Sequence, residues 1–287
     1  MTRRPMPASL PSRLHRGRLR HLAGMRVLVT GGSSGVGRAL AVHLAGCGAR
    51  VLATARRADR LESLAREAAP GAIVTEAGDI TNPDFRQHLC DVAAERLGGL
   101  DVCGCVAGSG AVGPFRDAAA ETLERIFAIN VLAPADLVRR CLPLLEAGND
   151  PAVVLVGSIL GYHPLPWHGE YCAAKAAVRS LAGGLRIELA PHGIDVLLAS
   201  LGPTQSEFWE GLVAGKRASW SRGRQMPAAQ AAAAIVRGLE GRRGEILPGW
   251  QAKGYALAAR FMPWLIDAVA SRRVRATAES PSTPTAP

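Results

Sequence analysis

The stretch that most constrains the fold is a short apolar run followed by a glycine-rich turn and a helical pattern. Residues 25–30 read Met-Arg-Val-Leu-Val-Thr, and residues 31–37 read Gly-Gly-Ser-Ser-Gly-Val-Gly. Residues 39–44 then continue with helical spacing. A strand, a glycine turn and a helix in this order form a dinucleotide-binding unit, because the glycines let the backbone approach a pyrophosphate at the helix N-terminus. The spacing is Gly-x3-Gly-x-Gly rather than Gly-x-Gly-x-x-Gly, so the turn alone is a weak signal.

Strand and helix patterns alternate along most of the chain. Long helical patterns cover 117–146 and 169–190. The expected strands are 26–30, 50–54, 72–76, 101–106, 152–158, 194–200 and 243–247. This alternation predicts an α/β fold, a Rossmann-like doubly wound seven-stranded parallel sheet with helices on both faces.

The two ends differ in composition from the body. The 287 residues carry a net charge of +10, but residues 1–24 hold six arginines and no acidic residue, so the body is nearly neutral. A nearly neutral body does not favour a nucleic-acid partner. We expect a basic, disordered leader at 1–24, one Rossmann domain at 25–250, an apolar helical extension at 251–275 and a disordered tail at 276–287.

Cysteine usage and apolar runs bear on location. The six cysteines are scattered, with no zinc spacing and no disulfide framework, so we expect no metal site and reduced thiols in a cytoplasmic protein. The N-terminus lacks the apolar core of a secretory signal. No apolar run reaches the ~20 residues that a membrane span needs.

A second pattern lies in the middle of the chain. Ser158 ends a Val-rich strand, and Tyr171 and Lys175 stand four residues apart where a helical segment begins. Residues four apart share a helix face. A phenol with a pKa of about 10 is a poor acid–base catalyst at neutral pH, and a nearby ammonium lowers that pKa. Ser158 can hold a substrate oxygen beside the phenol. The alternative is a surface Tyr and Lys at this spacing by chance.

Together, the Thr-Gly-x3-Gly-x-Gly turn and these three residues resemble the short-chain dehydrogenase/reductase family over residues 25–250. The resemblance implies an NADP(H)-dependent oxidoreductase that reduces a ketone or aldehyde, or oxidises the alcohol, by hydride transfer. Tyr171 is then the general acid/base and Ser158 orients the substrate oxygen. Lys175 lowers the pKa of Tyr171 and binds the nicotinamide ribose. Asn130 matches the family's fourth catalytic residue, which orders a water on the proton path from Lys175.

Cofactor choice depends on the end of the second strand, where Arg56 is the expected phosphate contact and Arg57 stands beside it. An acidic residue there would bind the ribose 2′-hydroxyl of NAD, whereas an arginine suits the 2′-phosphate of NADP. The alternative is two solvated arginines at the start of a helix. The resemblance adds Asp79 at the adenine, and the Thr204 backbone with the Ser206 hydroxyl at the nicotinamide carboxamide. The expected cofactor-binding residues are Gly31, Ser33, Ser34, Gly35, Val36, Gly37, Arg56, Arg57, Asp79, Ile80, Ala107, Gly108, Asn130, Tyr171, Lys175, Gly202, Thr204 and Ser206.

Two turns depart from the family pattern. The usual Asn-Asn-Ala-Gly after the fourth strand is Cys-Val-Ala-Gly at 105–108. The missing asparagines normally tie this turn to neighbouring strands, so the departure concerns its rigidity more than catalysis. The usual Pro-Gly-x3-Thr is Leu-Gly-Pro-Thr-Gln-Ser at 201–206.

Two stretches are expected on the substrate side. His163, Trp167 and His168 lie between the serine and the tyrosine. A histidine there is a second acid–base group or, more often, a residue that lines the pocket. Residues 207–226 fit a mobile loop over the substrate.

The C-terminal segment 254–270 is an addition to many family members. Pro263 is expected to break it into two short helical pieces. Its apolar face comprises Leu257, Phe261, Trp264, Leu265 and Val269. Three arginines follow between 272 and 275. This combination suits a segment that lies in a membrane interface or caps an apolar substrate tunnel. Packing on the protein's own core or on another subunit is the alternative.

Other functions and partners stay open. A 3-oxoacyl-carrier-type reductase is the second candidate, and a noncatalytic NADPH-binding regulator is the third. Family members commonly form dimers through two long helices, so we expect a homodimer or homotetramer through 117–146 and 169–190. The expected partners are a small carbonyl or alcohol substrate of hydrophobic or lipid-like character and a peripheral membrane contact through 254–275, with no nucleic acid. The expected location is cytoplasmic or membrane-peripheral.

Overall fold

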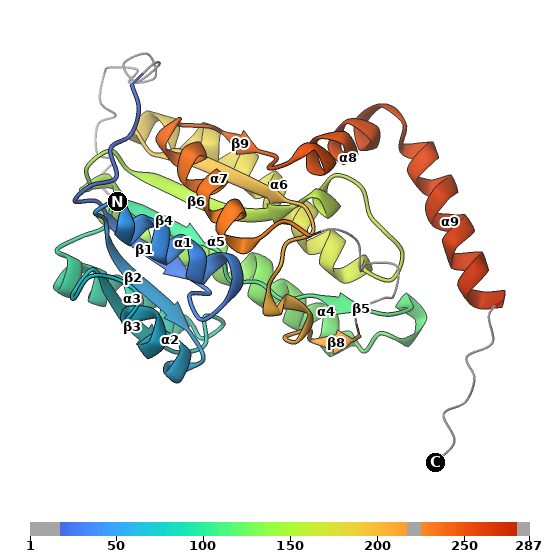
Figure 1. Ribbon diagram of the computed structural model, residues 1–287, viewed down its shortest axis with the longest axis horizontal. Helices are drawn as coiled ribbons and strands as arrows, with labels where there is room; N and C mark the ends of the chain where they lie inside the picture. Colours follow the sequence, from blue (N-terminus) through green and yellow to red (C-terminus); the bar gives the residue numbers. More distant parts are fainter. Residues whose placement is uncertain (1–17, 217–224, 280–287) are drawn as a thin grey trace, which may run out of the picture.

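The computed structural model describes residues 18–216 and 225–279. Within these residues a seven-stranded parallel sheet has the order β3-β2-β1-β4-β6-β7-β9 (Figure 1). The strands are β1 (Arg26–Thr30), β2 (Arg50–Ala55), β3 (Ile73–Ala77), β4 (Val102–Cys105), β6 (Ala152–Ser158), β7 (Asp195–Leu201) and β9 (Glu245–Ile246). The predicted doubly wound α/β fold is therefore confirmed.

Helices cover both faces of the sheet, because successive side chains of a buried parallel strand point to opposite sides. In β1, Val27 and Val29 pack with one core cluster, and Leu28 packs with the other. Helices of the first cluster are α1 (Gly35–Gly46), α2 (Ala58–Ala65) and α7 (Ala228–Glu240). Helices of the second are α3 (Pro83–Val92), α5 (Ala133–Glu146) and α6 (Gly169–Glu188).

The long helix expected at 117–146 is not a regular α-helix throughout. It begins as α4 (Ala120–Phe127), passes through a π-helical turn (Ala128–Leu132) and continues as α5. Asn130 lies inside this turn and is buried. Single π-helical turns within α-helices are frequent at functional sites.

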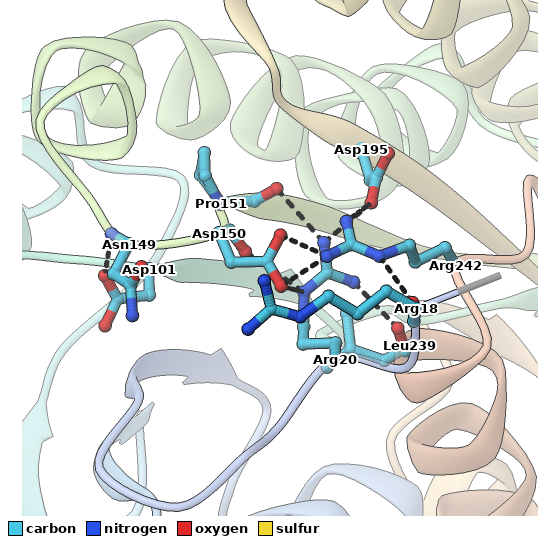
Figure 2. Close-up of polar contacts among 9 residues, drawn as sticks. All are labelled: Arg18, Arg20, Asp101, Asn149, Asp150, Pro151, Asp195, Leu239 and Arg242. Atoms are coloured by element: carbon cyan, nitrogen blue, oxygen red, sulfur yellow. Dashed lines mark hydrogen bonds and ion pairs between the residues drawn. The ribbon is translucent and has the colours of Figure 1, made fainter. Parts of the chain in front are cut away.

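Residues 18–24 lie against the body. The Arg20 side chain is 1% exposed. It donates to the Leu239 carbonyl at 2.7 Å, to Asp195 Oδ2 at 2.7 Å and to the Asp150 carbonyl at 3.0 Å (Figure 2). The sequence predicts a wholly disordered leader; residues 18–24 differ because the buried Arg20 side chain finds several acceptors at the amino end of the sheet. The rest of the expected leader lies outside the described residues.

Arg242 completes this charged group. Its Nη2 lies 2.6 Å from both carboxylate oxygens of Asp150, and its Nη1 lies 2.8 Å from Asp195 Oδ2. Its Nε donates to the Arg18 carbonyl at 3.0 Å. Two arginines and two aspartates thus join the N-terminal segment, the loop before β6, the start of β7 and the end of α7 (Figure 2).

The C-terminal segment forms two helices, α8 (Trp250–Phe261) and α9 (Pro263–Glu279), which confirms that Pro263 breaks it. Figure 1 shows α9 extending away from the sheet. Within α8, Ala252 and Ala256 are buried, but most large apolar side chains between Trp250 and Val269 are exposed. These exposed residues are Trp250, Leu257, Phe261, Met262, Trp264, Leu265 and Val269. The expected apolar face therefore does not pack on this chain's own core.

The tail expected at 276–287 begins as helix, because α9 continues to Glu279; the remainder lies outside the described residues. Among the helices of 18–216 and 225–279, none combines the length and the apolar content that crossing a membrane requires. A small parallel pair, β5 (Ala111–Val112) with β8 (Ala214–Gly215), holds part of the expected loop 207–226 against the body. Residues 217–224 of that loop lie outside the described residues.

Candidate active site

The serine, tyrosine and lysine converge at the carboxyl ends of the parallel strands, where open α/β sheets bind ligands. Ser158 is the last residue of β6, and its Oγ accepts from the Leu160 backbone at 3.1 Å. Tyr171 and Lys175 share one face of α6, with Nζ 5.6 Å from the centre of the phenol ring. The spacing of four therefore places the two side chains together, as the sequence predicts.

Burial governs the protonation of both α6 residues. Lys175 is 4% exposed, and its Nζ donates to the Val156 carbonyl at 3.0 Å. Desolvation lowers the pKa of this ammonium to about 8. Desolvation also raises the pKa of Tyr171 well above its ordinary value, although a hydrogen bond with Ser158 opposes the rise. We expected Lys175 to lower the pKa of Tyr171; in this state burial outweighs any such effect, so the phenol keeps its proton.

Asn130 presents an unused acceptor to the same place. Its Nδ2 donates to the carbonyls of Ser109 and Ile126, each at 2.9 Å. Its Oδ1 is buried and has no hydrogen-bond partner among the described residues. A methyl group placed on Gly108 would lie 2.9 Å from this Oδ1 and 3.5 Å from Lys175 Nζ. The acceptor and the ammonium thus face one spot, which fits a polar group held between them.

The glycine turn is shaped for close approach of an anion. Gly31 and Gly35 have φ of +76° and +54°, a region that favours glycine. A side chain at Gly37 would lie 2.2 Å from the Gly31 carbonyl oxygen. The Ser34 side chain makes no capping bond to α1, and the first turn of α1 contains no acidic residue. The first amides of α1 therefore suit a pyrophosphate.

A hydroxyl replaces the missing asparagines in the turn after β4. Thr30 Oγ1, at the end of β1, accepts from the backbone amides of Val106 and Ala107 at 2.9 Å and 3.0 Å. A cross-strand tie therefore remains. The departure in sequence does not leave this turn untethered.

Charged side chains surround the place expected for the adenosine. Arg57 donates to Glu207 Oε2 at 2.7 Å and to Ser33 Oγ at 3.1 Å. Asp79 accepts from the Thr81 amide and hydroxyl at 2.9 Å and 2.7 Å. Burial favours a higher pKa for Asp79, but these bonds and nearby arginines hold it below its ordinary value.

One cavity of about 800 Å³ joins these regions. Every residue expected to bind the cofactor lines it except Asn130, which lies behind Gly108; Ser158 lines it too. His168 lines it with a buried ring whose pKa desolvation lowers, so it stays neutral at pH 7. His163 does not line it and lies 2.9 Å from Asp267 instead. Trp167 does not line it either.

Several lining residues were not predicted. Tyr255 and Gln251 of α8 and Arg273 of α9 border the cavity, and the Tyr255 hydroxyl donates to the His163 carbonyl at 2.9 Å. No local motif marks these residues, because α8 reaches the site only by folding back. The apolar part of the lining comprises Ile159, Leu160, Leu165, Leu201, Phe208 and Trp209.

The fold and the site define a Rossmann-type protein with a Ser–Tyr–Lys group in a cavity that the glycine turn also lines. Residues 25–217 match the family model described as short chain dehydrogenase. A Hydroxysteroid 11-beta-dehydrogenase 1-like protein of Macaca fascicularis is 30% identical over 84% of this chain and 84% of its own length. The crystal structure of a short-chain dehydrogenase from Streptomyces avermitilis superimposes with a TM-score of 0.76, at 27% identity, over 88% of this chain and 98% of that one. The chain belongs to the short-chain dehydrogenase family.

Other relatives are matched over less of their length. A short chain dehydrogenase of Pseudocercospora fijiensis is 34% identical over 70% of this chain, but the match spans only 65% of that protein. An uncharacterized oxidoreductase of Escherichia coli, YghA, is 34% identical over 63% of each chain. This chain therefore spans less than two thirds of the length of these two curated relatives.

Proposed function

We propose that this protein is an NADP(H)-dependent oxidoreductase that reduces a ketone or aldehyde, or oxidises the corresponding alcohol. The observation that carries the proposal is the convergence of Ser158, Tyr171 and Lys175 on a cavity that the glycine turn also lines, with Asn130 directly behind Gly108. A nonenzymatic NADPH-binding regulator would not need all four groups in this arrangement.

The bound nicotinamide supplies or accepts the hydride. In the reductive direction the protonated Tyr171 gives its proton to the carbonyl oxygen, and the Ser158 hydroxyl bonds the same oxygen. Lys175, with a pKa of about 8, can exchange a proton near neutral pH. Asn130 Oδ1 holds a polar group beside Lys175, which gives a route for returning the proton to Tyr171.

Arg56 and Arg57 support a preference for NADP(H), because both line the cavity at the end of β2. The Arg56→Asp variant should bind NADPH more weakly and favour NADH. The loss of one charge-assisted contact is worth about 1.5–3 kcal/mol. Equal kcat/KM for the two cofactors in the wild type would contradict this preference.

The apolar lining supports a hydrophobic or lipid-like carbonyl substrate. Phe208, Trp209, Leu165 and Tyr255 border the cavity, and the Phe208 ring contacts the Tyr171 ring. A relative that matches most of this chain carries a hydroxysteroid dehydrogenase name, which is consistent with a bulky apolar alcohol or ketone. A short 3-oxoacyl group would contact fewer of these apolar residues, so a 3-oxoacyl-carrier reductase is the second candidate.

A direct test is a screen of carbonyl compounds with NADPH, followed by absorbance. The panel should contain steroid-type ketones, long-chain ketones and 3-oxoacyl thioesters. We expect turnover of the bulky apolar ketones that Tyr171→Phe abolishes. Tyr255→Phe is the matched control, since it removes another phenol hydroxyl beside the same cavity. NADPH binding without turnover of any carbonyl class would favour the regulator.

We also propose self-association through α4, α5 and α6. Leu132 and Ile187 are 61% and 78% exposed on these helices. Sedimentation velocity should show a dimer or tetramer that Ile187→Glu weakens. A wild type that is monomeric at micromolar concentration would contradict this assembly. A cytoplasmic location belongs to the same proposal and is supported by six free cysteines.

The exposed face of α8 and α9 supports a peripheral membrane contact. Phe261 and Trp264 are 65% and 66% exposed, and the arginines at 272–275 follow them. Apolar side chains next to cations suit an anionic bilayer surface. Flotation with anionic liposomes should fall when Phe261 and Trp264 are both changed to Ser. Phe115→Ser, which removes an exposed aromatic ring elsewhere, is the control. Equal flotation of all three proteins would leave contact with another subunit as the explanation.

A further inference from the structure

An ion pair crosses the cleft between the expected phosphate-binding arginines and the loop on the opposite side. Glu207 Oε2 lies 2.7 Å from Arg57 Nη1, and Glu207 Oε1 lies 3.8 Å from Arg60. Arg57 follows β2, whereas Glu207 begins a short helical turn, Glu207–Trp209, after β7. The carboxylate therefore already occupies Arg57, one of the two arginines expected at the 2′-phosphate of NADP.

The same turn contacts the catalytic tyrosine. The rings of Phe208 and Tyr171 lie 5.4 Å apart at 63°, an edge-to-face contact. One residue earlier, Ser206 lies against the glycine turn, because a side chain on Gly35 would come within 2.7 Å of Ser206 Cβ. Residues 206–208 therefore contact the pyrophosphate turn, the phosphate-binding arginine and the phenol in succession.

We propose that Glu207 is a cofactor-specificity residue that competes with the ribose 2′-phosphate for Arg57. The inference rests on the proposed function, since it assumes that a nicotinamide dinucleotide binds in this cavity. NADPH must exchange the carboxylate for its phosphate, whereas NADH leaves the ion pair in place. Exchange frees the Glu207–Trp209 turn from β2, so the phosphate also changes how firmly Phe208 is held on Tyr171.

The exposure of the pair makes this exchange feasible. The side chains of Arg57 and Glu207 are 44% and 30% exposed. Exposed ion pairs are weak, and a dianionic phosphate offers more charge and more acceptor oxygens than one carboxylate. A carboxylate left beside the phosphate would repel it. Glu207 therefore opposes NADPH binding and does not affect NADH binding. It reduces the preference for NADPH over NADH that the arginines create.

The test compares Glu207→Gln with Glu210→Gln. Both variants remove one negative charge from the same loop, but Glu210 forms no ion pair among those found in the described residues. Dissociation constants for NADPH and NADH are measured by titration calorimetry. We expect Glu207→Gln to tighten NADPH about threefold to tenfold and to leave NADH within about twofold. Glu210→Gln should leave the ratio of the two constants at the wild-type value.

Two further measurements assign the effect to Arg57 and to the phosphate. The gain from Glu207→Gln should disappear in an Arg57→Gln background, and it should appear with 2′-AMP but not with 5′-AMP as the probe. An NADPH-to-NADH ratio that Glu207→Gln leaves unchanged overturns the inference. So does an equal change in Glu210→Gln, which would indicate a general charge effect.

These outcomes separate the inference from the function on which it rests. A wild type that binds neither dinucleotide overturns both. A wild type that binds and oxidises NADPH, with Glu207→Gln behaving identically, overturns only the role of Glu207. A wild type that prefers NADH would contradict the NADP assignment, yet the variant would still reveal whether Glu207 competes with a phosphate.

Discussion

Charged and polar side chains are paired differently at the two edges of the sheet, the amino edge where the parallel strands begin and the carboxyl edge where they end. At the amino edge each buried charge has several partners: Arg20 and Arg242 share Asp150 and Asp195, and Asp101 accepts from Arg26. At the carboxyl edge Lys175 is buried and donates to the Val156 carbonyl, and Asn130 Oδ1 has no hydrogen-bond partner among the described residues. Satisfied charges hold one edge rigid, whereas unsatisfied groups at the other remain available to a ligand.

This contrast assigns stability to one edge and chemistry to the other. A fully paired buried charge is costly to disturb, because its partner would be left without compensation. A buried ammonium without a carboxylate partner, or a buried amide oxygen without a donor, is itself a cost to the fold, and such costs are typical of functional sites. Substitutions at the two edges should therefore have separable effects on activity and on the free energy of unfolding.

The largest expected effect is on turnover. Tyr171→Phe should lower kcat by about 100-fold to 10,000-fold, because it removes the proposed general acid. It should not lower the free energy of unfolding, since the ring and its contact with Phe208 remain. Stopped-flow turnover and urea denaturation measure the two quantities. A parallel loss of stability would remove the contrast between the edges.

The next effect is on stability alone. Arg20→Met should lower the free energy of unfolding by about 2–4 kcal/mol, because it leaves Asp195 and Asp150 with fewer partners. The kcat of the folded fraction should stay at the wild-type value. Arg18→Met is the matched control, since Arg18 contributes its backbone carbonyl to Arg242 and keeps it. A change in kcat in Arg20→Met would show that the two edges are coupled.

A smaller effect has the opposite sign. Lys175→Met should raise the free energy of unfolding by about 1–2 kcal/mol at pH 7, because the fold no longer buries an ammonium. The pKa of Lys175 is about 8 in the fold against an ordinary 10.5, so the unfolded chain binds more protons between these values. Wild-type stability should therefore rise across that window, and the advantage of the variant should shrink. Urea titrations at pH 7 and pH 10 test the sign.

The smallest effect concerns the ion pair across the cleft. Glu207→Gln should change the free energy of unfolding by less than about 0.5 kcal/mol, because the pair is exposed. Glu210→Gln should behave alike in this measurement, although the two differ in cofactor binding. A loss as large as that of Arg20→Met would mean that Glu207 is structural.

Local sequence patterns were sufficient to predict the fold and the main site residues. The β1–turn–α1 unit and the spacing of Ser158, Tyr171 and Lys175 could be predicted, because each depends on a few neighbouring residues. The break at Pro263 follows from one residue type for the same reason. The π-helical turn at Asn130 could not be predicted, since its apolar pattern is the same as that of an ordinary helix.

Contacts between segments that are far apart in the chain could not be predicted from the sequence. Thr30, on another strand, accepts the hydrogen bond that holds the turn lacking the asparagines. Tyr255, which follows β9 in the chain, borders the cavity. The pairing of Arg57 with Glu207 joins positions far apart in the chain. Each depends on how the chain folds back, which residue spacing does not encode. The burial of Arg20 is the extreme case, because an arginine-rich N-terminus usually indicates a solvated segment.

The position of Arg20 affects how the protein should be shortened for expression. The family match begins at Met25, which makes that methionine an obvious place to start a recombinant chain. A chain cut there would lose Arg20 and the Arg18 carbonyl, so Arg242 alone would face Asp150 and Asp195. Such a product should melt at a lower temperature although every side chain of the proposed active site is present. A purification tag placed before residue 18 would keep the contacts of Arg20 and of the Arg18 carbonyl.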